Sequence, residues 1–94
     1  MELTFEWDEE KAKENVGKHK VSFEEAKTVF NDPFLVTFPD PGHYGGERRY
    51  INIGVSSQGR TLVLVHTERG SDIRIISCRK ATAKERGAYE EEGL

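Results

Sequence analysis

The spacing of hydrophobic and polar residues predicts a strand and a helix at the start of the chain. Residues 3–7 alternate between apolar and polar side chains, which is the period of a half-buried strand. Asp8 follows with the character of a helix N-cap, since two glutamates occupy the next positions, where the helix dipole favours anions. The helix is expected to run to about residue 18, with Ala12 and Val16 on its inner face.

A second helix is expected to open at a capping box, in which Ser22 precedes Glu25 by three residues. Its apolar side chains recur at helical spacing and fall on one face: Phe23, Ala26, Val29 and Phe30. The sequence Asn31-Asp32-Pro33 ends this helix, because proline cannot continue it. Two short helices therefore precede the long strands of the chain.

The middle of the chain has the composition of consecutive strands separated by turns. The expected strands are residues 34–38, 47–56, 60–68 and 72–80. Between the first two lies a turn-rich loop, residues 39–46, with two prolines and three glycines. A further capping box at residues 82–85 predicts a C-terminal helix.

Helices followed by a run of strands predict an α+β fold. We expect residues 1–94 to form one domain, with an antiparallel sheet of four to five strands, two N-terminal helices packed on one face and a short C-terminal helix. The sheet face away from the helices would then remain available for a ligand.

Charge is distributed unevenly along the chain, and this changes the functional classes to consider. The net charge is −3, yet residues 60–86 carry seven Lys and Arg against three acids. A local excess of cations, rather than the net charge, decides whether a phosphate backbone is attracted. The single cysteine, Cys78, excludes an internal disulfide and is expected to be a buried thiol. No signal peptide or membrane-spanning segment is recognisable, so a cytoplasmic protein is expected.

The cations of the last two strands are candidates for a phosphate clamp: Arg69, Arg74, Arg79 and Lys80. Solvated surface charge is the ordinary alternative for each of them. Strict alternation places Arg74 and Lys80 on one face of the strand and Arg79 on the other, unless the strand ends or bulges. Lys18, between the two helices, is either part of a solvated turn or a contact to an RNA backbone.

His66 and Glu68 are the candidates for proton transfer. Histidine titrates near neutral pH, but His66 shares its strand face with Leu62 and Leu64, and such a histidine is more often a hydrogen-bonded core residue. Glu68 is either a base or orienting group, or an ion-pair partner of Arg74. The three histidines lack the spacing of a zinc site, and no nucleotide-binding glycine loop is present, so no metal and no cofactor are expected.

Four segments resemble the BrnT family, the toxins of type II toxin–antitoxin systems. They are FEWDEEKAKENVGKHKVSFEEAKTVFNDP, ERRYINIG, VLVHTERG and RIISCRKATAKERGAYEE, in the family's order and over almost the whole chain. The resemblance implies a RelE-like fold and an endoribonuclease that arrests translation. It also implies a BrnA-like ribbon-helix-helix antitoxin as partner, with operator DNA contacted only through that antitoxin.

The resemblance also implies which residues act on RNA. Arg79 and Lys80 match the family's basic pair, with Lys in place of the usual second Arg, and Lys18 matches a basic turn. The HTERG segment of this chain matches the family at His66, Glu68 and Arg69. The implied chemistry needs no metal: a base (His66 or Glu68) deprotonates the ribose 2′-hydroxyl, and cations stabilise the phosphorane-like transition state. Arg69, Arg74 and Arg79 are the expected stabilisers.

A protein of another class remains open at this point. A non-catalytic binding module, acting as partner or co-repressor of a small DNA-binding protein, would use the apolar and acidic surface for protein contact alone. If the protein is a toxin, its acidic N-terminal half and acidic tail are the expected docking surfaces for a basic antitoxin segment.

Overall fold

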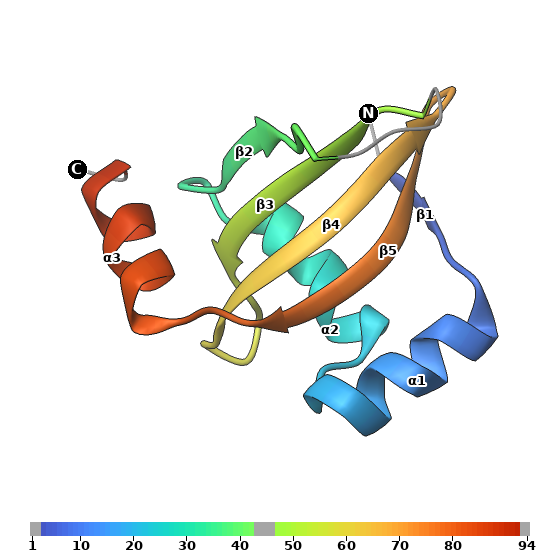
Figure 1. The fold of residues 1–94 in the computed structure, drawn as a ribbon, viewed down its shortest axis with the longest axis horizontal. Helices are drawn as coiled ribbons and strands as arrows, with labels where there is room; N and C mark the ends of the chain where they lie inside the picture. Colours follow the sequence, from blue (N-terminus) through green and yellow to red (C-terminus); the bar gives the residue numbers. More distant parts are fainter. Residues whose placement is uncertain (1–2, 43–46, 93–94) are drawn as a thin grey trace.

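The computed structural model describes residues 3–42 and 47–92 and has an α+β fold (Figure 1). Its elements in chain order are β1 (Thr4–Glu6), α1 (Glu9–His19), α2 (Phe23–Ala26), the 3₁₀ helix η1 (Lys27–Asn31), β2 (Val36–Pro39), β3 (Arg49–Val55), β4 (Thr61–Arg69), β5 (Asp72–Lys80) and α3 (Ala83–Glu92). Part of the predicted 39–46 loop, residues 43–46, lies outside the described residues.

The five strands form one mixed sheet in the order β1-β5-β4-β3-β2. The neighbours from β5 to β2 pair antiparallel, as predicted, but β1 pairs parallel with β5. The expectation of a wholly antiparallel sheet is therefore wrong at this edge. A parallel pair needs a long crossover connection. The chain between β1 and the rest of the sheet supplies one, because it includes α1 and α2.

A bulge in β5 changes which side chains share a face. Val65 of β4 pairs with Ser77, and the next residue, His66, pairs with Ile75. Ile76 is therefore an extra residue of β5 that has no partner in β4. As a result both Ile75 and Cys78 point into the core beneath the helices. Their neighbours Arg74 and Arg79 consequently face the opposite side together. Strict alternation, which separated these two arginines, is wrong here.

The core lies between the sheet and the first helices; in Figure 1, α2 lies behind the sheet and α1 lies beside the edge formed by β1 and β5. Its buried members come from the segment before α2, from α2 and η1, and from β4 and β5: Val21, Phe23, Ala26, Val29, Leu62, Leu64, Ile75 and Cys78. Burial of these apolar side chains is the main stabilising contribution of such a core. The predicted buried thiol of Cys78 is confirmed, and burial raises the pKa of this thiol to about 12.

Helix α1 is attached to the sheet by a buried asparagine. The Nδ2 group of Asn15 donates to the carbonyls of Val21 (2.9 Å) and Cys78 (2.8 Å), and its Oδ1 accepts from the Cys78 amide (3.1 Å). Asn15 thus satisfies backbone groups of β5 beyond the end of β1, where no strand pairs with β5 on that side. Val16, predicted on the inner face, is 45% exposed instead.

Helix α3 packs beside β3 and leaves most of the sheet's outer face uncovered (Figure 1). Its predicted capping box is confirmed, since Glu85 N donates to Thr82 Oγ1 (3.2 Å) and Thr82 N to Glu85 Oε1 (2.9 Å). Further along, the Tyr89 hydroxyl donates to Asp32 Oδ2 at 2.5 Å. Helix α3 is therefore fixed near its start by the capping box and further along by Tyr89. A space remains between the helix and the sheet. No helix among the described residues is long and apolar enough to cross a membrane.

Candidate functional site

The uncovered face of the sheet forms a groove of about 850 Å³ against α3. Its floor is apolar and comes from β2, β3 and β4: Val36, Phe38, Ile51, Ile53, Val63 and Val65. Ser77 and Arg79 of β5 line one side, and Glu85 and Tyr89 of α3 line the other. A concave apolar surface with a few converging polar groups is the usual form of a ligand site.

Of the predicted phosphate-binding cations, Arg79 is the one that lines this groove. Its guanidinium donates to both carboxylate oxygens of Glu85, from Nη1 to Oε1 (2.7 Å) and from Nη2 to Oε2 (2.8 Å). The hydrogen bond from Arg79 is the main reason why the pKa of Glu85 falls to about 2. Glu85 is in turn fixed by the capping box, so the guanidinium is held in one orientation. The Arg79 side chain is still 42% exposed and can meet an anion in the groove.

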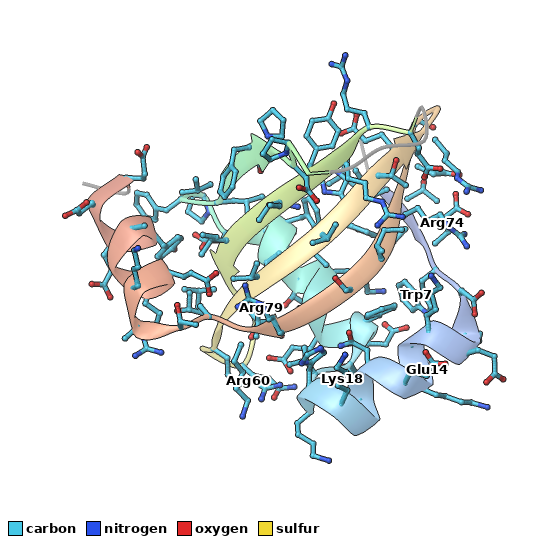
Figure 2. The ribbon with its side chains drawn as sticks, in the orientation of Figure 1. Trp7, Glu14, Lys18, Arg60, Arg74 and Arg79 are labelled. Atoms are coloured by element: carbon cyan, nitrogen blue, oxygen red, sulfur yellow. The ribbon has the colours of Figure 1, made fainter. Side chains whose placement is uncertain are left out.

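Two further arginines lie on the same face at the other end of the sheet. Arg74 forms an ion pair with Glu6 of β1, with 3.0 Å between Nη1 and Oε2. Arg49 of β3 is opposite Thr67, which is opposite Arg74, so the three side chains form a row across the sheet. Figure 2 shows Arg74 and Arg79 at opposite ends of β5.

Sequence reasoning did not select Arg49, although a signal was present. The residues at 51, 53 and 55 alternate on one face of the predicted strand, and Arg49 continues that pattern. Its Nε is buried without a hydrogen-bond partner among the described residues. A buried polar group of this kind calls for an explanation, and a role at a functional site is one.

His66 lies on the other side of the sheet from Arg79. It is 2% exposed, its ring stacks on Tyr50 (5.2 Å between centroids), and Phe30 contacts its edge (5.4 Å). Asn52 Oδ1 accepts from Thr37, so the Asn52 amide nitrogen faces His66 Nδ1 at 2.7 Å. Nδ1 is therefore the acceptor, and Nε2 carries the proton.

The electrostatic state of His66 follows from this burial. Burial is the main cause that lowers the pKa of His66, and the neighbouring Glu68 opposes it only in part, with 3.4 Å between Nε2 and Oε2. The imidazole is thus a neutral, hydrogen-bonded core group. The structure does not bring the predicted base His66 and the predicted clamp residue Arg79 into one site.

The remaining predicted residues lie around the molecule rather than in the groove. Glu68 and Arg69 are exposed at the β4–β5 turn, where Arg69 Nη2 is 4.0 Å from Glu47 Oε2. Lys80 pairs with Leu62 and is exposed on the helix side of the sheet, and Lys18 is exposed in the last turn of α1. Among residues 3–42 and 47–92, no group of three or more His, Cys, Asp or Glu side chains is arranged to hold a metal ion.

A fixed arginine in an open groove is suited to binding a phosphate, which defines a class of anion-binding protein. Comparison with known proteins identifies the family. The model of the family described as the ribonuclease toxin, BrnT, of type II toxin–antitoxin systems matches residues 7–85. The chain therefore belongs to the BrnT family of ribonuclease toxins, as the sequence resemblance indicated.

A solved structure supports the fold. The crystal structure of the Brucella abortus ribonuclease toxin BrnT is similar with a TM-score of 0.68 and 23% identity, over 86% of this chain and 99% of that one. At this identity the likeness concerns the fold alone. No curated protein matches the chain significantly.

Proposed function

We propose that this protein cleaves RNA in the groove on the open sheet face, with Arg79 as the principal phosphate-stabilising residue. The observation that carries the proposal is the position of Arg79: it lines the groove, and Glu85 holds its guanidinium in a fixed orientation. A preorganised cation stabilises charge that develops on a phosphate without first having to reorganise. Membership of a ribonuclease toxin family supports RNA as the substrate.

The three arginines of the open face suggest a path for the RNA backbone. Arg74 and Arg79 are five positions apart on β5, which is roughly 15 Å along a strand. A single strand that runs from Arg79 towards Arg74 and Arg49 would cross the apolar floor between them. Bases can pack on that floor while phosphates meet the arginines, the usual division of labour in single-strand binding. Arg69, Lys80 and Lys18 are proposed as outer contacts to flanking phosphates, and Glu68 as a group at the turn end of this path.

In the proposed reaction the nucleophile belongs to the RNA. The ribose 2′-hydroxyl attacks the adjacent phosphorus, and Arg79 stabilises the additional negative charge of the transition state. No step requires a metal ion. DNA of the same sequence should resist cleavage because it lacks the nucleophile, and a chelator should leave RNA cleavage unchanged.

The test is expression of the protein alone, followed by growth measurement and mapping of RNA ends, with Arg79→Gln as the inactive variant. Arg86→Gln is the matched control, because Arg86 is an exposed arginine of α3 that does not line the groove. We expect growth arrest and RNA cleavage with the unaltered protein and with Arg86→Gln, and a loss of roughly 100-fold or more with Arg79→Gln. Full cleavage by a folded Arg79→Gln protein would remove Arg79 from this role.

The family also implies an antitoxin partner. We propose a BrnA-like ribbon-helix-helix antitoxin that represses the shared operon, a RelE-like assignment of the fold, and action in the cytoplasm. The apolar floor of the groove favours one competing function, a non-catalytic module that binds a protein segment there. A folded, well-expressed protein that neither cleaves RNA nor arrests growth would favour that alternative.

A further inference from the structure

We infer that His19, and not His66, is the side chain that takes the proton from the 2′-hydroxyl of the RNA. This inference rests on the proposed ribonuclease function and adds a catalytic residue to it. His19 is the last residue of α1 and lines the same groove as Arg79. It is half-buried, so part of the residue is open to a ligand.

The position of His19 follows from the attachment of α1. Asn15, one helical turn earlier, is hydrogen-bonded to the amide and carbonyl of Cys78, the residue before Arg79. His19 is four residues further on, roughly 6 Å along the helix axis. The helix then ends, because Lys20 has a left-handed backbone conformation (φ 61°). The ring of His19 is thereby placed beside the end of β5 from which Arg79 projects.

His66 and His19 differ in whether their ring nitrogens are already engaged within the protein. Both nitrogens of His66 have partners, Asn52 and Glu68, within the protein, and its ring is shielded from the groove by the sheet. None of the hydrogen bonds among the described residues involves the ring of His19. A proton-transfer group must reach the hydroxyl of the substrate, so geometry favours His19.

The charged groups around this end of the groove come from β5, from α3 and from the turn before β4. Arg79 projects from β5, Lys84 and Glu85 line the groove from α3, and the Arg60 guanidinium donates to the carbonyl of Lys20, next to His19. Glu85 is paired with Arg79, and Arg60 is itself paired with Glu25, so Lys84 is the cation that makes this end of the groove positive overall. Such surroundings favour the binding of a phosphate beside His19.

The proposed step is balanced as follows. The 2′-hydroxyl gives its proton to a ring nitrogen of His19 while the 2′-oxygen forms a bond to phosphorus. The bond from phosphorus to the 5′-oxygen breaks, and the leaving 5′-oxygen takes a proton from water. The imidazolium then releases its proton to the hydroxide that remains. The products are a 2′,3′-cyclic phosphate and a 5′-hydroxyl, which end mapping distinguishes from the products of direct hydrolysis.

The test compares His19→Gln with the neighbouring variant Lys18→Gln in single-turnover cleavage of an RNA oligonucleotide between about pH 5 and pH 9. Binding is measured separately with a 2′-O-methyl oligonucleotide of the same sequence, which cannot be cleaved. We expect His19→Gln to slow cleavage by roughly 100- to 10,000-fold, to remove the acidic limb of the rate profile, and to change binding by less than about twofold. Lys18→Gln, which removes a proposed outer phosphate contact, should weaken binding but retain the acidic limb of the rate profile.

A second variant keeps the inference falsifiable if His19→Gln folds poorly. Glycine is well tolerated at helix C-termini, so His19→Gly is expected to fold, and added imidazole should restore part of its cleavage rate. Unchanged rate and pH profile in His19→Gln, or no rescue of His19→Gly by imidazole, would overturn the role of His19. If Arg79→Gln still abolished cleavage in that case, the proposed ribonuclease function would stand. Absence of cleavage by the unaltered protein would overturn both.

Discussion

Arg49 carries a buried guanidinium nitrogen, Nε, for which the described residues offer no acceptor. An unpaired buried donor costs about 1–3 kcal/mol, which natural cores generally avoid. The side chain also faces the open side of the sheet, in the row with Thr67 and Arg74. Local features that disagree with stability are expected at functional sites. A substitution of Arg49 can therefore separate its effect on stability from its effect on RNA binding.

We predict that Arg49→Met weakens RNA binding without loss of stability. Methionine retains the aliphatic packing and removes the unpaired donor, so the free energy of unfolding should stay constant or rise by up to about 1 kcal/mol. If one phosphate contact is lost, the slope of log affinity against log salt for single-stranded RNA should fall by about 0.7. Urea unfolding and binding of a 2′-O-methyl oligonucleotide measure the two effects.

The control is Arg48→Met, which makes the same change in charge at the adjacent, exposed position. Its binding and salt slope should stay close to those of the unaltered protein. If Arg48→Met and Arg49→Met lost the same amount of RNA affinity, charge alone, and not the geometry of Arg49, would attract the RNA.

His66 gives a second residue-scale prediction, on the pH dependence of stability. Burial lowers the pKa of His66 in the folded state relative to its ordinary value of 6.5. The unfolded state then binds more protons below that value, so the stability present above pH 6.5 is lost as the pH falls through the folded pKa. His66→Gln removes the titrating group. Its urea midpoint should decline less than that of the unaltered protein between about pH 7.5 and pH 5.5. If the urea midpoints of both proteins changed in parallel with pH, His66 would not be held neutral in the folded state.

At the scale of elements, the attachment of α1 depends on Asn15. Its side chain satisfies the Val21 carbonyl and both backbone groups of Cys78, all in the buried core. We predict that Asn15→Ala lowers the free energy of unfolding by about 3 kcal/mol, because these groups lose their partner without access to water. Glu14→Ala, an exposed position on the same helix, should change it by less than about 0.5 kcal/mol. Urea unfolding with equal midpoints for both variants would contradict the attachment.

Most elements were predictable because their signals are local, although only Phe23–Ala26 of the predicted second helix is α-helical and Lys27–Asn31 continues as a 3₁₀ helix. The caps at Asp8 and Thr82 form the predicted hydrogen bonds. At Ser22 only half of the predicted box forms: Glu25 N donates to Ser22 Oγ, but the Glu25 carboxylate accepts from Ser56 and Arg60. That departure results from tertiary structure, since the partners of Glu25 are about thirty residues or more away in sequence.

The site was predictable only in part, since it depends on which face each residue occupies. The shared face of His66, Leu62 and Leu64 was evident from alternation, but alternation does not say which face the helices cover. The bulge at Ile76 was not visible either, because an extra apolar residue leaves no mark in an already apolar run. A one-residue shift moves every later side chain to the other face. The position of the helices and the bulge at Ile76 together decide that Arg79, and not His66, lines the groove.

At the scale of the whole molecule, the charges of opposite sign have different distributions. The open face carries Arg49, Arg74 and Arg79, whereas the last turn of α3 is acidic, with Glu90, Glu91 and Glu92. On α1 the three glutamates are balanced by three lysines. The acidic residues of α3 lie at the rim of the groove, since Glu92 contributes to its lining. A basic protein segment bound there would cover the proposed path of the RNA.

This arrangement predicts that the antitoxin binds by charge and competes with RNA. Association between opposite charges weakens as salt screens them, and the screening length falls from about 10 Å at 0.1 M to about 3 Å at 1 M ionic strength. We expect the affinity for the antitoxin to fall by at least roughly tenfold over that range, and by much less when Glu90, Glu91 and Glu92 are all replaced by Gln. The triple variant should still cleave RNA when the antitoxin is absent, because these residues are separate from Arg79. Calorimetric titration measures the affinity, and a constant affinity at all salt concentrations would place the antitoxin on an apolar surface instead.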